Sequence, residues 1–300
     1  MKKNGLTISV VFEAQSANFG EGMGNISSLK QLSRGDGNSY TYISRQALRY
    51  SIVKQLAWDQ GDNKKLLFAQ GSGEKTVIQF SPEATISEYP EIDLFGYMKT
   101  RKGKTGGAET RNAVARLSHA ISLESYKADT DFLTNKGLAD RIGSANSIAQ
   151  SENHKSYYAY TLTIDLDRIG VERDKSGKIT EEIPNAEKAK RVGDLLNVIK
   201  LLYRDIRGRR ENLSPIFVIG GVYETKNPYF ADRIKLYKGK LDISKIIGAM
   251  TVDEDSEKNT AVGYLSGAFA NDADIYDKLK PVSVREFFDG LKKEVGDYYA

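Results

Sequence analysis

Apolar and polar residues alternate along residues 6–13 (LTISVVFE), near the start of the chain. In a strand this alternation places Leu6, Ile8, Val10 and Phe12 on one face and mostly polar residues on the other. The pattern therefore predicts a strand that turns one face to the core.

Four further segments have an apolar pattern that predicts a strand or a helix. Strands are predicted at 157–166 (YYAYTLTIDL), where the period is two, and at 215–223 (PIFVIGGVY), which reads as a buried run. A spacing of 3.6 residues predicts a helix from about 186 to 206. After Pro281, a closing helix is expected through 284–295 (VREFFDGLKKEV). The segment at 110–126 fits a helix and a strand equally well.

Polar and glycine-containing segments separate these elements. Residues 59–111 contain short apolar runs between turn-forming clusters, which predicts a small insertion of strands and turns. Residues 127–156 are small and polar, as expected for an extended or mobile insertion, and 173–185 predicts a hairpin. The order of elements predicts an α+β fold with helices on one face of an antiparallel sheet, which includes the ferredoxin-like pattern.

A long basic loop at 18–39 (NFGEGMGNISSLKQLSRGDGNS) follows the first strand. Its glycines allow the backbone to approach another molecule closely. Lys30 and Arg34 supply positive charge in the same loop. These features are compatible with contact to an anionic ligand.

A helix is predicted to begin directly after Ser44, whose hydroxyl suits an N-cap. Arg45 and Arg49 then lie one above the other at i, i+4 spacing, and Tyr40 and Tyr42 lead into them. Helix N-terminal amides and guanidiniums together form a site for a chain of phosphates. The same residues also fit an ordinary strand–helix unit with a solvated loop, and both interpretations stay open at this point.

Composition narrows the class of protein. The 300 residues carry 44 Lys and Arg against 40 Asp and Glu, a net charge of +4 that is compatible with nucleic-acid binding. The chain has no cysteine, so disulfides and thiolate chemistry are excluded. Without a run of about 20 apolar residues or a signal-peptide core, we expect a cytoplasmic protein with no membrane contact.

Motifs for nucleotide or acyl chemistry are weak. The GKT at 103–105 resembles the end of a P-loop, but six residues separate Gly96 from Gly103 where the motif needs four. No serine lies in a G-x-S-x-G turn. We therefore expect a contact loop at 103–105 and no catalytic residue.

Metal-site patterns are equally incomplete. His119 and His154 lie far apart in the sequence and lack a second ligand at helical spacing, and we expect His119 to be a partly buried structural residue. The acidic run at 253–259 has a lysine where a calcium loop needs glycine. Asp165 and Asp167 share one side of a strand and either hold a cation or proton between them or face water. We expect no metal and no cofactor.

The chain resembles the Cas-seven family, the repeated subunit that binds guide RNA (crRNA) along the backbone of CRISPR Cascade complexes. Within that family it is most similar to the DevR-like branch of type I-B systems. Landmarks in matching order carry the resemblance. They are the first strand with its NFGEGMGN loop, YTYISRQALRYSI, DLFGYM (93–98), RLSHAISLESYKADTDFLT (116–134), YYAYTLTIDL and SPIFVIGGVYETKNPYF (214–230).

The resemblance implies an RRM-like palm across residues 1–300, with a finger insertion at 59–111 and a thumb insertion at 123–156. Copies would form a helical backbone along one crRNA, as part of an antiviral defence complex. The expected partners are the crRNA, target DNA, other copies of the chain, other Cascade subunits and a helicase-nuclease recruited in trans. The subunit itself would be non-catalytic: it would hold the guide while base pairing reads the target sequence, and cleavage would belong to the recruited helicase-nuclease.

The family motif at the first helix contacts RNA phosphates through a serine, a glutamine and a basic residue. These roles fall on Ser44, Gln46 and Arg49, with Lys30 as the loop partner. Arg45 agrees with the motif in charge, although some relatives have a small residue there.

Further contacts are expected from the loop and the thumb. Arg34 and Tyr42 belong to the same RNA-binding set by position and chemistry. In the thumb, Phe132 and Leu133 are candidates to wedge between bases, a role that apolar side chains can fill.

Two alternatives to the scaffold remain. Type III relatives cut target RNA with an acidic residue in the loop after the first strand, and Asp36 lies in such a loop. The chain could also act as a free-standing regulator that binds its own transcript.

Overall fold

The structure is a computed structural model that describes most of the chain. The described residues are 2–15, 17–20, 22, 24–60, 66–71, 73, 76–100 and 107–300. The GKT motif at 103–105 lies outside these residues.

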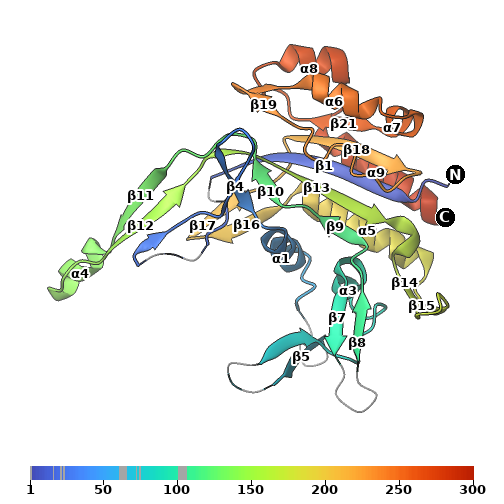
Figure 1. Ribbon diagram of the computed structural model, residues 1–300, viewed down its shortest axis with the longest axis horizontal. Helices are drawn as coiled ribbons and strands as arrows, with labels where there is room; N and C mark the ends of the chain where they lie inside the picture. Colours follow the sequence, from blue (N-terminus) through green and yellow to red (C-terminus); the bar gives the residue numbers. More distant parts are fainter. Residues whose placement is uncertain are drawn as a thin grey trace.

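An antiparallel sheet forms the centre of the molecule (Figure 1). Its order is β21-β18-β1-β13-β10-β4-β3, and β9 also pairs with β13. The pairing of β1 with β13 runs from Gly5 opposite Asp165 to Ala14 opposite Ser156. The strands are β1 Gly5–Ala14, β3 Gln31–Ser33, β4 Ser39–Ile43, β9 Ala115–Leu117, β10 Ala120–Ser122, β13 Ser156–Asp165, β18 Phe217–Tyr223 and β21 Ala261–Tyr264. The strands predicted near 6–13, 157–166 and 215–223 are confirmed.

Three helices cover one face of this sheet: α1 (Arg45–Gln55), α5 (Asn185–Lys200) and α9 (Val284–Tyr299). They pack on the predicted apolar face of β1, whose Leu6, Ile8, Val10 and Phe12 are fully buried. A capping box stabilises the N-terminus of α9, because the side chains of Ser283 and Glu286 each accept a hydrogen bond from the other residue's backbone N–H. The predicted closing helix is therefore confirmed.

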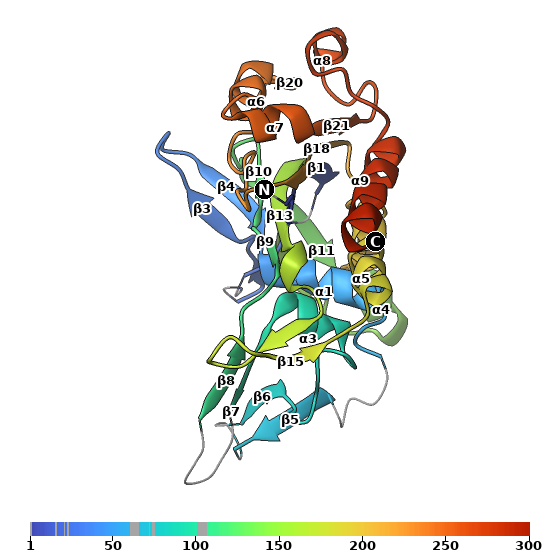
Figure 2. The same ribbon diagram turned by 90° about the vertical axis from the view of Figure 1, so that its right-hand side faces the viewer.

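A second layer of helices packs against the other face, over β18 and β21 (Figure 2). It consists of α6 (Ile243–Met250), α7 (Glu254–Asn259) and α8 (Asp272–Leu279). The expectation of helices on a single face is wrong, because Val11, Phe217 and Ile219 are apolar on the side opposite the first core. The mixed α+β class is confirmed.

The region at 59–111 extends away from the sheet (Figures 1 and 2) and contains short hairpins, as predicted. Its elements are β5 Leu67–Gln70, β6 Val77–Phe80, α3 Pro90–Phe95, β7 Tyr97–Thr100 and β8 Ala108–Arg111. In the ambiguous segment at 110–126 the chain forms strands β9 and β10, so the strand alternative is the observed one.

The region at 127–156 forms an arm that projects from the sheet (Figure 1). Strands β11 (Asp129–Thr134) and β12 (Ile148–Asn153) pair along its length, and α4 (Lys136–Ile142) lies at its tip. Strand β2 (Ile26–Ser27) from the basic loop pairs in parallel with β12. The arm is thus tied to the loop that follows β1.

The helix predicted to reach residue 206 ends earlier, at Lys200. Leu202 is fully buried, and Tyr203–Ile206 forms β16, which pairs with β17 (Arg209–Asn212). A buried ion pair explains the change, because Arg204 Nη2 lies 2.7 Å from Glu211 Oε2 across the hairpin. The prediction failed because spacing within the segment does not reveal this cross-strand partner.

The remaining short elements connect these layers. They are η2 Leu166–Arg168, β14 Val171–Arg173, β15 Ile179–Glu182, β19 Leu236–Tyr237 and β20 Lys240–Leu241. The pairing of β14 with β15 confirms the predicted hairpin. Of the helices in the described ranges, none combines the length and the apolar character required to cross a membrane.

Candidate nucleic-acid interface

The start of α1 is fixed by its predicted cap. Ser44 Oγ accepts a hydrogen bond from Ala47 N at 3.2 Å, and Ser44 N donates to Asn18 Oδ1 at 3.2 Å. Leu48 and Ile52 anchor the helix in the first core. Ser44 is buried, so its hydroxyl oxygen has a structural task in addition to the RNA contact that the resemblance implies.

The first residue of α1 connects the helix to the sheet. Arg45 N donates to Nδ1 of His119 at 3.1 Å, while the Arg45 side chain is exposed. Burial lowers the pKa of His119, and the charges of Arg45 and Lys30 lower it further. The neutral ring also packs edge-on against Tyr42, with 5.1 Å between ring centroids. The prediction of a satisfied, partly buried His119 is confirmed.

The hairpin of β3 and β4 holds the acidic residue of the basic loop. The Asp36 carboxylate accepts hydrogen bonds from the Tyr40 hydroxyl and from Asn38 N. The Tyr40 hydrogen bond is the main reason that the pKa of Asp36 lies below its usual value. The guanidinium of Arg34 stacks over the Tyr40 ring, 4.3 Å from its centroid.

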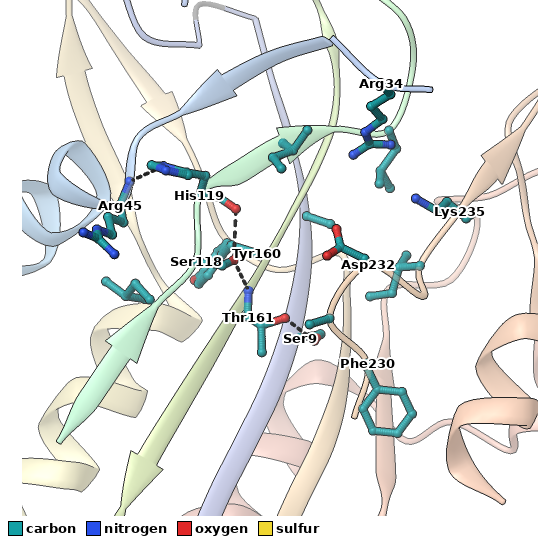
Figure 3. A pocket seen from close by; sticks show the side chains of 16 residues that line it. Ser9, Arg34, Arg45, Ser118, His119, Tyr160, Thr161, Phe230, Asp232 and Lys235 are labelled. Atoms are coloured by element: carbon teal, nitrogen blue, oxygen red, sulfur yellow. Dashed lines mark hydrogen bonds between the residues drawn. The ribbon is translucent and has the colours of Figure 1, made fainter. Parts of the chain in front are cut away.

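A cavity of about 220 Å³ lies on the sheet face opposite α1, α5 and α9 (Figure 3). Its floor is polar, because Ser9 Oγ and Thr161 Oγ1 share a hydrogen bond of 2.6 Å between β1 and β13. Arg34 and Lys235 reach it from one side, and Arg45 lies at its other end, beyond His119.

A second cavity, of about 390 Å³, lies on the other side of Arg45. Gln46, Arg49 and Arg116 line it together with Phe95. Because Arg45 borders both cavities, the two cavities together carry basic side chains from Lys235 to Arg49. Such a series can follow the phosphates of a single strand.

Two of these basic residues already have acidic partners. Arg49 Nη2 lies 2.7 Å from Glu91 Oε1 at the start of α3, and its guanidinium carbon is 5.3 Å from the Phe95 centroid. Arg116 donates two hydrogen bonds of 2.9 Å to Asp165.

Asp165 and Asp167 do not form the pair considered from the sequence. Asp165 is buried, which raises its pKa, but the hydrogen bonds and charge of Arg116, together with the charges of Lys226 and Arg168, lower the pKa overall. Asp167 pairs instead with Lys226. Across the residues that the structure describes, no three His, Asp or Glu side chains gather to hold a metal ion.

The structure brings some of the predicted RNA-binding residues together and separates others. Arg34 and Arg45 line the first cavity, and Gln46 and Arg49 line the second. Lys30 lines neither, although its charge acts on His119. Tyr42 lies against the ring of His119.

Phe132 and Leu133 lie on β11 in the arm and line neither cavity. Both are exposed, with 56% and 42% of their surface accessible. Their proposed contact with bases stays a prediction.

Three charged residues of these cavities were missed by the sequence analysis: Asp232, Lys235 and Arg116. Asp232 and Lys235 lie about 200 residues beyond Arg34 in the chain, and no local pattern links the two segments. Only the tertiary fold places them at one cavity.

Comparisons with known proteins identify similar chains. The model of the family "CRISPR-associated negative auto-regulator DevR/Csa2" matches residues 6–245. The chain is 26% identical over 159 residues to the CRISPR-associated protein Cas7/Cst2/DevR of Myxococcus xanthus (strain DK1622). That match covers 49% of this chain and 52% of the relative, so it spans about half the relative's length.

Two solved structures share the fold. A chain of a "CRISPR RNA-guided surveillance complex, pre-nicking" superimposes with a TM-score of 0.60 at 12% identity, covering 97% of this chain and all of that one. A chain of a "CRISPR RNA-guided surveillance complex" gives 0.52 at 13% identity, covering 95% of this chain and 99% of the other.

Proposed function

The chain belongs to the DevR/Csa2 family of CRISPR-associated proteins, and from that membership we propose that it is a non-catalytic subunit that binds the guide RNA. Several copies line up along one crRNA and form the backbone of a Cascade surveillance complex of type I-B. The complex pairs the guide with target DNA and recruits a helicase-nuclease in trans.

The topology supports an RRM-like palm for this role. In the sheet the order β18-β1-β13-β10 has α1 in the connection after β1 and α5 in the connection after β13. This order supports the ferredoxin-like arrangement that we propose for the palm. The regions at 59–111 and 123–156 then take the parts of finger and thumb.

The observation that carries the proposal is the series of basic side chains around the start of α1. Arg34, Arg45 and Lys235 come from separate segments, and none of them forms an ion pair with a described residue. Unpaired cations along a surface provide sequence-independent affinity for a phosphate backbone.

The test removes two predicted phosphate contacts, Lys30→Ala together with Arg49→Ala. We expect weaker RNA binding for all sequences. The slope of the salt dependence should fall by about 0.7 to 1.4, since each single-strand contact contributes about 0.7 and Arg49 is already paired with Glu91. Lys278→Ala on α8, an exposed lysine outside both cavities, is the matched control. An unchanged affinity in filter-binding titrations across salt would exclude this cradle.

Sequencing the RNA that co-purifies with the chain tests the class of ligand. Spacer RNA flanked by repeat sequence supports the Cascade subunit. Enrichment of the chain's own transcript would instead favour a free-standing regulator, the possibility to which the words "negative auto-regulator" in the family description point.

The ribonuclease alternative depends on Asp36. Its carboxylate is engaged by Tyr40 and Asn38 within the hairpin, which argues for a structural task. A metal-supplemented assay on target RNA paired with the guide compares the parent with Asp36→Asn. We expect no site-specific cleavage from either protein, and cleavage that the substitution abolishes would overturn the scaffold.

A further inference from the structure

An acidic side chain points into the cavity that Arg34 and Lys235 line. Asp232 lies in the loop between β18 and β19, and its carboxylate is directed into the middle of the first cavity (Figure 3). It makes no hydrogen bond and no ion pair with any residue in the described ranges. A purely phosphate-binding cavity has no use for such a group, because a carboxylate repels phosphate.

The loop holds Asp232 in a defined position. Its neighbours Phe230 and Ile234 are buried in the core of the second helical layer. The backbone at Asp232 has φ 59°, in the left-handed region that aspartate tolerates better than most residues. Arg233 N donates to Phe230 O at 3.1 Å and closes the turn around it.

Arg34 and Lys235, which line the cavity with Asp232, form no ion pair with a described residue. Burial and the nearby charge of Arg34 lower the pKa of Lys235, and the charge of Asp232 offsets only part of this. The cavity therefore offers two cations without an ion-pair partner, beside an exposed carboxylate that accepts no hydrogen bond from the described residues. A ligand that carries an anion and a hydrogen-bond donor a short distance apart fits both.

We propose that this cavity binds one nucleotide of an RNA strand, with its phosphate at Arg34 and Lys235 and its ribose 2′-hydroxyl donating to Asp232. The inference rests on the proposed RNA-binding function and adds a means of distinguishing RNA from DNA. A phosphodiester has no proton to donate, whereas every ribonucleotide carries a 2′-hydroxyl close to its phosphate. Deoxyribose would leave the carboxylate facing a phosphate without compensation.

The test compares oligouridine with oligodeoxyuridine of equal length, bound to the parent protein and to Asp232→Ala. These ligands differ only in the 2′-hydroxyl, and their bases carry no exocyclic amino group. We expect the parent to prefer RNA by about ten-fold or more, the scale of a hydrogen bond to a charged group. In Asp232→Ala the RNA affinity falls, the DNA affinity is kept or rises, and the preference approaches one.

Further variants separate the two contacts. Lys235→Ala should weaken both ligands equally and leave their ratio unchanged, because it removes only a phosphate contact. Asp232→Asn keeps an acceptor oxygen and the backbone conformation, so it should retain part of the preference. Asp277→Ala on α8, an exposed carboxylate outside the cavity, should change nothing.

The outcomes distinguish the inference from the function on which it rests. If Asp232→Ala strengthens RNA and DNA binding equally, the carboxylate only repels phosphate and the inference is wrong, while RNA binding stands. If the parent binds neither oligomer, the proposed function fails and the inference fails with it.

Discussion

The basic side chains around the start of α1 differ in how much of their charge is already neutralised. Arg34, Arg45 and Lys235 form no ion pair within the described ranges, whereas Arg49 is paired with Glu91. A guanidinium in an ion pair must share or release its carboxylate before it can bind a phosphate. A count of basic residues at this surface therefore overstates what Arg49 would contribute to the proposed RNA binding.

Substitution of Glu91, the ion-pair partner of Arg49, should show how much this pair weakens the proposed RNA binding. In Glu91→Gln the guanidinium is free, so we expect RNA to bind about two- to five-fold more tightly, with a salt slope steeper by up to about 0.7. Filter binding at several salt concentrations measures both the affinity and the salt slope. Glu88→Gln, which removes the same charge from an exposed residue, is the control. Equal effects of the two substitutions would mean that the ion pair does not restrain Arg49.

At the scale of elements, the sequence predicted those strands and helix ends that depend on residues close together in the chain. Strict alternation identified β1 and β13, and the hydroxyl of Ser44 located the start of α1. Partners distant in sequence were invisible, such as Glu91, which lies 42 residues after Arg49. The sequence therefore predicted the part of the candidate site around α1, but not the residues that arrive on β9 and on the loop that carries Lys235.

In the arm, too, the sequence predicted the local structure but not which side chains would be covered by other parts of the fold. Its polar sequence predicted an extended insertion, and the structure has two paired strands with a helix at the tip. Phe132 and Leu133 stay exposed because a two-stranded arm has no second layer to cover them. As neighbours in one strand they point to opposite faces, so only one of them can face a given base step.

This geometry leads to a prediction for the proposed wedge. We expect one of Phe132→Ala and Leu133→Ala to abolish periodic base exposure along the bound guide, and the double substitution to match that one. Chemical probing of the RNA in assembled complexes gives the readout. The thermal midpoint of the isolated chain should not move, because both residues are exposed.

Thr130→Ala is the control for position, since Thr130 lies on the same face of β11 as Phe132 and is also exposed. A base-exposure pattern that survives both single substitutions and the double one would exclude the wedge. A pattern lost equally in the control would indicate that the arm acts through its backbone.

At the scale of the whole molecule, one buried carboxylate joins the region at 59–111 to the rest of the fold. Asp93 on α3 is fully buried and binds Arg111 at 2.7 Å, Arg191 at 2.8 Å and Gly170 N at 2.9 Å. These partners lie on β8, on α5 and after η2. Arg191 also donates to the carbonyl of Ile86, so the charges of this cluster are hydrogen-bonded on several sides.

Loss of that carboxylate should loosen the whole region, because two guanidiniums would remain buried without it. We expect Asp93→Asn to lower the free energy of unfolding by about 3–5 kcal/mol, the usual cost of breaking a buried pair. Asp205→Asn makes the same charge change in an exposed pair with Arg210 and should cost less than about 1 kcal/mol. Chemical denaturation of both variants decides the matter, and equal losses would show that the buried cluster does not hold the fold together. Since Glu91 shares α3 with Asp93, Asp93→Asn should also release Arg49 and alter the salt dependence of RNA binding.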